Sequence, residues 1–369
     1  MNYELEKKET TLVIQQVSLR ELERKYDEAE RLDLPGFTYF NDIEVVQWFL
    51  YAPRHLHREN DRSERTVREY EMEITQCITH MMEYSEEIGL DVQLKDRSLW
   101  KSLDKRHLRR YQQWLAYDSP YVKENGSYAK ATLERKTNIL SSFFKFLYDI
   151  EYIERPIHEG FRTATVRKDD RPNRDLGPSD IRTLLQAFRS MNHPLMEAII
   201  LILTTTGMRN AEFCSLKTTD VYKDTIHNNY YLAITGKGNK RRDVPLRKET
   251  FEAIRTFRAL RGLDFPTEEE GPLFPTSRGS YYSPSYFSQY MNKELKKLPS
   301  NILNNIPVKL TPHTFRHAFA IISHRSGVDV YDIMRSLGHE RIDTTMIYLE
   351  KVFAKERHAI HSWDAFFNE

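Results

Sequence analysis

Residues 230–246, YYLAITGKGNKRRDVPL, form the stretch of the chain that decides its fold class. Apolar side chains alternate with other residues from Tyr230 to Ile234, and this period of two is typical of a half-buried strand. The glycine-containing segment 236–240 predicts a turn, and residues 241–246 predict the returning strand. The sequence therefore predicts a β-hairpin at this point.

Helical patterns lie on both sides of the hairpin. Apolar residues recur at helical spacing and stop at a glycine or proline in the first half of the chain, where they predict helices over 18–34, 41–51, 64–88, 103–117 and 131–148. Gly177-Pro178-Ser179-Asp180 has the pattern of another helix start, ahead of the hairpin. The predicted fold is therefore mainly α with a small β-hairpin or sheet, an α+β class.

Length and composition exclude several classes of protein. The chain has 369 residues, which predicts two to three domains, and 55 basic against 54 acidic residues, a net charge of +1. The longest strongly apolar run, 198–203, is far shorter than the roughly 18 residues of a membrane helix, and residues 1–9 contain no secretory signal. Only Cys77 and Cys214 are present, so a disulfide scaffold is excluded and a reducing cytoplasm is favoured.

Charge is distributed unevenly along the chain. Residues 1–40 carry nine acids against six bases, so we expect this helical extension to lie away from any nucleic acid, with its apolar stripe packed within the molecule. Residues 155–174 carry six bases against three acids and lack helical periodicity, which predicts a basic linker. The predicted parts are an acidic extension at 1–40, a helical domain at 41–155, a linker at 156–175 and a second domain at 176–369.

Four separated motifs in the second domain carry anion-binding or reactive side chains. They are Thr206-Gly207-Met208-Arg209-Asn210-Ala211-Glu212, Lys237 in the hairpin turn, His313-Thr314-Phe315-Arg316-His317, and Leu337-Gly338-His339 with Tyr348 nine residues further on. Taken singly, each has an ordinary explanation, such as a helix ion pair between Arg209 and Glu212. Taken together, they predict phosphodiester chemistry, because arginine forks grip phosphate oxygens, a tyrosine can attack phosphorus and a lysine can protonate a leaving oxygen.

Two of the histidines also require a test for metal binding. His313 and His317 lie four residues apart, a spacing that suits two zinc ligands on one helix face. No glutamate adjoins the first histidine, no cysteine cluster adds ligands, and the cation of Arg316 would repel a metal ion. The sequence therefore favours a phosphate site, and it predicts no metal and no cofactor.

The order of these motifs resembles that of the tyrosine recombinase (phage integrase) family, in the pattern of Xer-like and mobile-element integrases. The resemblance covers nearly all of residues 176–367, and residues 132–147 resemble the last helix of the family's core-binding domain. It implies a two-domain, C-shaped DNA clamp, with a core-binding (SAM-like) domain at 41–155 and a catalytic domain with a C-terminal tail at 176–369.

The resemblance also implies a role for each motif residue. The family's catalytic set falls on Arg209, Lys237, His313, Arg316, His339 and Tyr348. The two arginines would clamp the scissile phosphate, the two histidines would hydrogen-bond it, Lys237 would protonate the leaving 5′ oxygen, and Tyr348 would form a 3′-phosphotyrosyl intermediate. Glu212 would orient the first arginine, His317 matches a structural, supporting position that follows the second, and Lys240 is the rival to Lys237 as the general acid.

We expect DNA contacts from basic residues in three places, namely the start of the last helix of the first domain, the linker and the hairpin. These residues are Lys130, Arg135, Lys136, Arg167, Lys168, Lys240, Arg241 and Arg242. On its own, the basic helix start is equally consistent with a solvated surface. The tail 349–369 is expected to pack either on its own domain or on a neighbouring protomer.

The implied function is that of a site-specific DNA recombinase that cuts and rejoins duplex DNA without a metal ion, for integration or excision of a mobile element or for resolution of replicon dimers. Its implied partners are double-stranded DNA with specific half-sites and, on that DNA, further copies in a homo-tetramer, with room for accessory directionality factors. A monomer or dimer is expected free in solution, in the bacterial cytoplasm with the nucleoid. The alternatives are a type IB topoisomerase, a catalytically silent DNA-binding regulator and a metal-dependent hydrolase.

Overall fold

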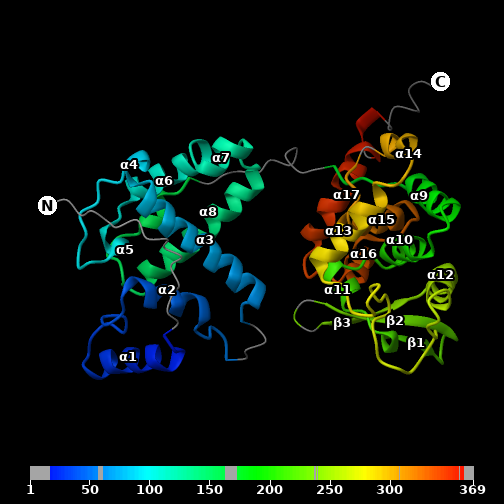
Figure 1. Cartoon of the computed structure of the whole chain (residues 1–369), viewed down its shortest axis with the longest axis horizontal. Helices are drawn as coiled ribbons and strands as arrows, with labels where there is room; N and C mark the ends of the chain where they lie inside the picture. The colour runs from blue at the N-terminus through cyan, green and yellow to red at the C-terminus, as the bar shows by residue number, and fades with distance from the viewer. Residues whose placement is uncertain are drawn as a thin grey trace. The chain divides into compact units, whose positions relative to one another are not determined.

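The computed structural model describes residues 17–56, 61–162, 173–236, 238, 240–306, 308–356 and 358–360. The chain divides into two compact units, unit 1 (residues 1–171) and unit 2 (residues 172–369), and each is described by itself (Figure 1).

Unit 1 is built from helices. They are α1 (Leu19–Arg31), α2 (Asp42–Tyr51), α3 (Glu64–Glu83), α4 (Ser85–Ile88), α5 (Leu99–Ser102), α6 (Lys105–Tyr117), α7 (Pro120–Asn125), α8 (Lys130–Asp149) and the 3₁₀ helix η2 (Ile157–Gly160). The helices predicted over 41–51, 103–117 and 131–148 are confirmed within two residues at each end. The single helix predicted over 64–88 is two helices, because the chain leaves the helical conformation at Tyr84.

The first helix packs into the core of unit 1. Its N-terminus is capped by Ser18, whose hydroxyl accepts a hydrogen bond from the Glu21 backbone N–H at 3.3 Å. Leu22 is fully buried, and Lys25 Nζ lies 2.6 Å from Glu44 Oε1 on α2. The prediction that the apolar stripe of this helix packs within the molecule is confirmed.

The packing of unit 1 continues past residue 155, where the linker was expected to begin. Ile157 in η2 is buried in the core of the unit. The Gln112 side chain accepts a hydrogen bond from the Arg162 N–H at 2.8 Å and donates one to the Arg162 carbonyl at 2.7 Å. These contacts join residues 156–162 to α6, although these residues show no helical periodicity in the sequence.

Unit 2 combines helices with one sheet. Its elements are α9 (Pro178–Ser190), α10 (Pro194–Thr206), α11 (Asn210–Cys214), η4 (Thr218–Asp220), β1 (Val221–Asp224), β2 (Asn229–Thr235), β3 (Arg241–Pro245), α12 (Lys248–Ala259), α13 (Pro284–Leu295), α14 (Ser300–Asn305), α15 (Pro312–Arg325), α16 (Val330–Leu337) and α17 (Ile342–Glu356). The predicted hairpin is confirmed as the antiparallel pair β2–β3, in which Ile234 faces Arg242. The short strand β1 extends it to a three-stranded sheet of order β1-β2-β3, which the sequence did not predict.

The central helix of unit 2 is α10. Ten of its thirteen residues are buried, so it is apolar on all sides, as expected of a helix surrounded by others. It packs against α9, α12 and α15, while the sheet lies along one end of the unit (Figure 1). The predicted fold class, mainly α with a small sheet, is confirmed.

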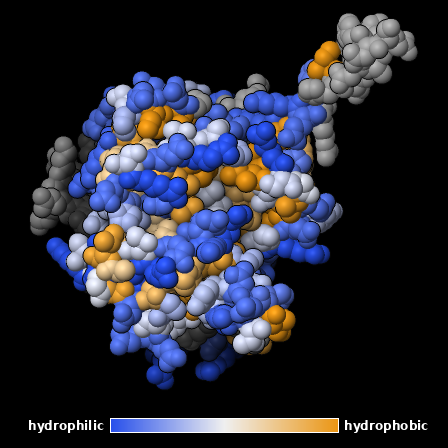
Figure 2. All heavy atoms as spheres, turned by 90° about the vertical axis from the view of Figure 1, so that its right-hand side faces the viewer, coloured by the Kyte–Doolittle hydropathy of each residue, from blue (hydrophilic) through white to orange (hydrophobic). Residues whose placement is uncertain are grey.

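The molecular surface is mostly hydrophilic on the face shown in Figure 2, with apolar residues in smaller groups between the polar ones. None of the helices within the described ranges is long and apolar enough to cross a membrane.

Candidate active site

The first part of the site is built where α10 ends and α11 begins. Arg209 caps α11, and its backbone N–H donates to Glu212 Oε2 at 2.8 Å while its Nη1 donates to Oε1 at 2.8 Å. Glu212 is 4% exposed. Burial alone would raise the pKa of this carboxyl, but hydrogen bonds from Arg242 and Arg209 outweigh it and lower the pKa to about 2. The carboxylate is therefore charged and holds Arg209 in a fixed orientation.

Gly207 makes this turn possible. Its φ of +60° lies in the left-handed region, and a Cβ atom there would lie 2.7 Å from the Leu337 side chain. Its carbonyl accepts a hydrogen bond from Arg316 Nη1 at 2.6 Å. The end of α10 thereby supports an arginine that is 109 residues away in the sequence.

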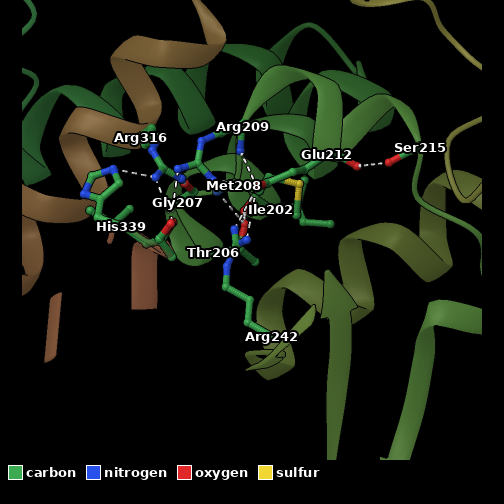
Figure 3. A network of polar contacts seen from close by, with 12 residues as sticks. Ile202, Thr206, Gly207, Met208, Arg209, Glu212, Ser215, Arg242, Arg316 and His339 are labelled. Carbon is green, nitrogen blue, oxygen red and sulfur yellow. Dashed lines mark hydrogen bonds and ion pairs between the residues drawn. The ribbon is translucent and has the colours of Figure 1, made fainter. Parts of the chain in front are cut away.

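Arg316 lies at the centre of the site, on α15 (Figure 3). It is 1% exposed, and its Nη2 donates to the Leu337 carbonyl and to His339 Nε2, both at 2.7 Å. Burial lowers the pKa of this guanidinium and the Arg209 cation lowers it further, whereas the Tyr348 phenol opposes both. An arginine stays protonated through such changes, so the site keeps two neighbouring cations.

His339 follows α16 and connects it to α17. Because a guanidinium can only donate, His339 Nε2 is the acceptor in its contact with Arg316, and the proton of the neutral ring is on Nδ1. That nitrogen lies 2.8 Å from the hydroxyl of Thr345, which is fully buried on α17. Both ring nitrogens are thus engaged by protein groups, and His339 orients Arg316 in this structure.

Tyr348 lies on α17 with 7% of its surface exposed. Its ring centre is 4.0 Å from that of His317, 5.4 Å from His339 and 5.6 Å from His313. Three histidines therefore surround the one tyrosine that the sequence singled out as a nucleophile.

These histidines are uncharged at neutral pH. Burial, followed by neighbouring cations, lowers the pKa of His313 to about 4 and that of His339 to about 3. For His317, burial and then His313 lower the pKa to about 3, and neither nitrogen of this buried ring has a hydrogen-bond partner among the described residues. The positive charge of the site therefore comes from its arginines. The neutral rings of His313 and His317 are the candidate proton acceptors, because Nε2 of His339 already accepts from Arg316.

Two contributors to the site were missed from the sequence. Arg174 was counted only as a linker cation, yet its charge is near enough to lower the pKa of both His313 and His317. Thr345 carries no sequence signal, because a threonine on an amphipathic helix is unremarkable until its partner is known. Arg174 acts on a segment about 140 residues away, whereas Thr345 acts on His339 only six residues away, through a contact that the turn between α16 and α17 creates.

The structure brings together most of the predicted catalytic and supporting residues. They are Arg209, Glu212, His313, Arg316, His317, His339 and Tyr348. Lys237 lies outside the described residues. No group of three or more His, Cys, Asp or Glu side chains within the described ranges is placed to hold a metal ion.

The residues expected to contact DNA differ in their exposure to solvent. Lys136 is 7% exposed, with its Nζ 2.6 Å from Glu73 Oε2 and 2.7 Å from Gln76 Oε1, so it belongs to the interior of unit 1 and we withdraw it as a DNA contact. Arg135 pairs with Glu69 beside it. Lys130, at the first turn of α8, is exposed.

In the hairpin, Arg241 and Lys240 are exposed, and Lys240 Nζ lies 2.5 Å from Glu340. Arg242 instead turns inward to Glu212, so we withdraw it as a DNA contact as well. Arg167 and Lys168 lie outside the described residues.

Removal of the Thr345 hydroxyl tests how the site is held together. We expect Thr345→Val to slow the DNA cleavage that the motif order predicts by about 10-fold, because His339 loses its fixed orientation and with it one support of Arg316. Thr344→Val, an exposed neighbour on the same helix, is the matched control. Single-turnover cleavage rates measure the difference, and equal rates for both variants would contradict the role of Thr345.

Comparison with known proteins places this geometry in context. The sequence profile of the phage integrase family matches residues 174–355. The tyrosine recombinase XerC of Alcanivorax borkumensis is 26% identical over 311 residues, covering 84% of this chain and 89% of that protein. XerC of Erythrobacter litoralis is 33% identical over 227 residues, which cover 60% of this chain and 68% of that protein.

Two solved structures share the fold. The XerH site-specific recombinase bound to a palindromic difH substrate, in a post-cleavage complex, matches with a TM-score of 0.57 and 19% identity over 88% of this chain and 95% of that one. A lambda integrase tetramer bound to a Holliday junction matches with a TM-score of 0.54 and 13% identity over 90% and 78%.

Proposed function

The chain belongs to the phage integrase family and is a tyrosine site-specific recombinase, and we propose that Tyr348 is its nucleophile and that unit 2 carries the whole phosphate-binding site. The observation that supports this most is the convergence of three other segments of unit 2 around the Tyr348 phenol. Arg209, Arg316, His339 and Tyr348 lie on different elements, yet they make one continuous set of contacts.

In the proposed reaction, the phenol oxygen of Tyr348 attacks the scissile phosphorus while the bond from phosphorus to the 5′ oxygen breaks. A neutral histidine accepts the phenol proton, and His313 and His317 are the candidates because their rings lie against Tyr348. The 5′ oxygen leaves as a hydroxyl, with Lys237 as the proposed proton donor. The resulting phosphotyrosine ester conserves the phosphodiester energy, so a 5′ hydroxyl can reverse the step.

The two arginines supply the electrostatic part of the mechanism. Negative charge increases on the phosphate oxygens in the transition state, and fixed cationic donors stabilise it without reorganisation. Arg316 and Arg209 are fixed in this way, since each donates to a backbone carbonyl of the segment 337–338.

We propose double-stranded DNA with specific half-sites as the substrate and a homo-tetramer as the acting assembly. The relatives with this fold are recombinases bound to DNA, and one of them is a tetramer on a Holliday junction. Unit 1 is proposed as the core-binding domain, which contacts the same duplex as unit 2. Accessory directionality factors, and action on the DNA of a bacterial cytoplasm, are part of the same proposal.

A nicked suicide DNA substrate tests the proposed function. We expect the wild-type protein to form a denaturation-resistant adduct with such DNA in the presence of EDTA, because no step of the proposed reaction requires a divalent ion. The substrate is to be designed from the DNA that flanks the gene, by searching it for direct or inverted repeats that form two half-sites around a short spacer. Absence of an adduct on that DNA would contradict the proposal, and relaxation of plasmid lacking these sites would indicate a topoisomerase instead.

A further inference from the structure

Arg242 differs from the other cations of the hairpin in where its side chain points. Side chains alternate along β3, so Arg241 and Asp243 lie on one side and Arg242 and Val244 on the other. The Arg242 side chain is 14% exposed, whereas that of Arg241 is 64% exposed. A basic residue placed inward on a DNA-facing hairpin requires an explanation other than DNA contact.

Glu212 supplies the partner. Arg242 Nη1 and Nη2 lie 3.2 Å from Glu212 Oε1 and 2.7 Å from Oε2, so the guanidinium spans both carboxylate oxygens (Figure 3). The same two oxygens accept hydrogen bonds from the side chain and the backbone of Arg209, both at 2.8 Å. One buried carboxylate therefore joins two arginines that are 33 residues apart.

This arrangement determines the net charge around Arg209, where a phosphate would bind. The pair of Arg209 and Glu212 is neutral as a unit, and its attraction for a phosphate would be correspondingly weak. With Arg242 included, the group of three carries one net positive charge. The carboxylate can then orient Arg209 without cancelling it.

Arg242 also contacts the segment before His339. Its Nη1 lies 3.4 Å from the position that a Cβ atom of Gly338 would occupy, and Gly338 has a φ of +64°. The Gly338 carbonyl accepts a hydrogen bond from Arg209 Nη2 at 3.3 Å. A Cβ atom there would be in ordinary van der Waals contact with Arg242, so it is the left-handed backbone conformation that disfavours a larger residue at this position.

The hairpin turn is fixed at the same point. The Gly236 N–H donates to the Lys240 carbonyl at 2.8 Å, so the two ends of the turn are joined to each other. A Cβ atom on Gly236 would lie 3.1 Å from Glu212 Oε1, so the turn begins directly beside the carboxylate. The position of Glu212 therefore affects both the phosphate-binding arginine and the base of the turn.

From these contacts we infer that Arg242 is a positioning residue for DNA cleavage. It neutralises Glu212, keeps the charge of Arg209 available to the scissile phosphate and fixes the hairpin turn against the site. The inference rests on the proposed function of unit 2, and it assigns to Arg242 an effect on the rate of cleavage and not on the affinity for DNA.

Arg242→Gln, measured against Arg255→Gln, tests this inference. Arg255 is an exposed arginine on α12 that pairs with Glu252, outside the site. With saturating protein on the suicide substrate, we expect Arg242→Gln to cleave about 10- to 100-fold more slowly, because a small displacement of a catalytic group is enough to cause a loss of that size. Its affinity for the same DNA should stay within about 3-fold of the wild-type value. Arg255→Gln should match the wild type in both.

Two further variants separate positioning from folding. Arg242→Lys keeps the charge but cannot span both oxygens, so it should recover part of the lost rate. In the Glu212→Gln background there is no carboxylate charge to neutralise. Arg242→Gln should therefore lower the cleavage rate by a smaller factor there than in the wild type. Melting curves establish that each variant is folded before rates are compared.

The possible results separate this inference from the proposed function. If the wild type forms adduct and folded Arg242→Gln cleaves as fast, the inference alone is overturned. It is also overturned if DNA affinity falls in proportion to the rate, because Arg242 would then be a DNA ligand. If the wild type forms no adduct, the proposed function fails and the inference fails with it.

Discussion

Tyr348→Phe should abolish the covalent protein–DNA adduct while leaving the fold and the DNA affinity of the protein intact. Only the phenol oxygen is removed, and the ring can keep its contacts with His317, His339 and His313. No other nucleophile is proposed at the site. We therefore expect adduct formation on the nicked suicide substrate to fall below detection, measured by denaturing electrophoresis with labelled DNA.

Tyr331→Phe is the matched control for this variant. Tyr331 is an exposed tyrosine on α16 of the same unit, outside the site. It should form adduct at the wild-type rate. An adduct that persists in Tyr348→Phe would contradict the assignment of the nucleophile, and mapping the attached residue would then identify the true one.

Arg316→Lys should have the second largest effect, although it conserves the charge. A lysine cannot reach the Gly207 carbonyl, the Leu337 carbonyl and His339 Nε2 together, as the planar guanidinium does. Loss of a fixed donor to the transition state typically costs about 10²- to 10³-fold in rate. We expect a loss of that size in single-turnover cleavage.

The same variant should lower the stability of unit 2. Each buried carbonyl that loses its donor costs about 1–3 kcal/mol, so the melting temperature of the unit should fall by several degrees. Arg325→Lys, an exposed position at the end of the same helix, is the control and should change neither quantity. Wild-type cleavage by Arg316→Lys would show that Arg316 has no special role in binding the phosphate.

Local patterns in the sequence were sufficient to predict most of the helices and the hairpin. Helix caps act over three or four residues, so they can be read directly, as with Ser18 and with Gly177, whose N–H donates to Asp180 Oδ2 at 2.8 Å. The strand β1 was missed because its four residues, Val-Tyr-Lys-Asp, are too few to give a clear alternation of apolar and polar side chains, and its pairing with β2 defines it.

The set of catalytic candidates also came from the sequence, through the order of the motifs. Arg209, Arg316, His339 and Tyr348 were identified before any contact between them was known, and the structure places them together. The spacing of these residues along the sequence did not indicate which of them hold one another in place by hydrogen bonds. In particular, the hydrogen bonds from His339 to Arg316 and Thr345 come from the structure alone, and its contact with phosphate stays a prediction.

What the sequence determined by itself is the near-neutral average charge, the types of residue and the local elements that carry them. What only the tertiary structure decided is which charges face outward. From the sequence, Lys136 and Arg242 were predicted to be surface cations, yet each points inward to a carboxylate, Glu73 or Glu212, from a distant segment. The physical reason is that burying a charge depends on a partner in space, and a partner 63 or 30 residues away leaves no mark in the local pattern.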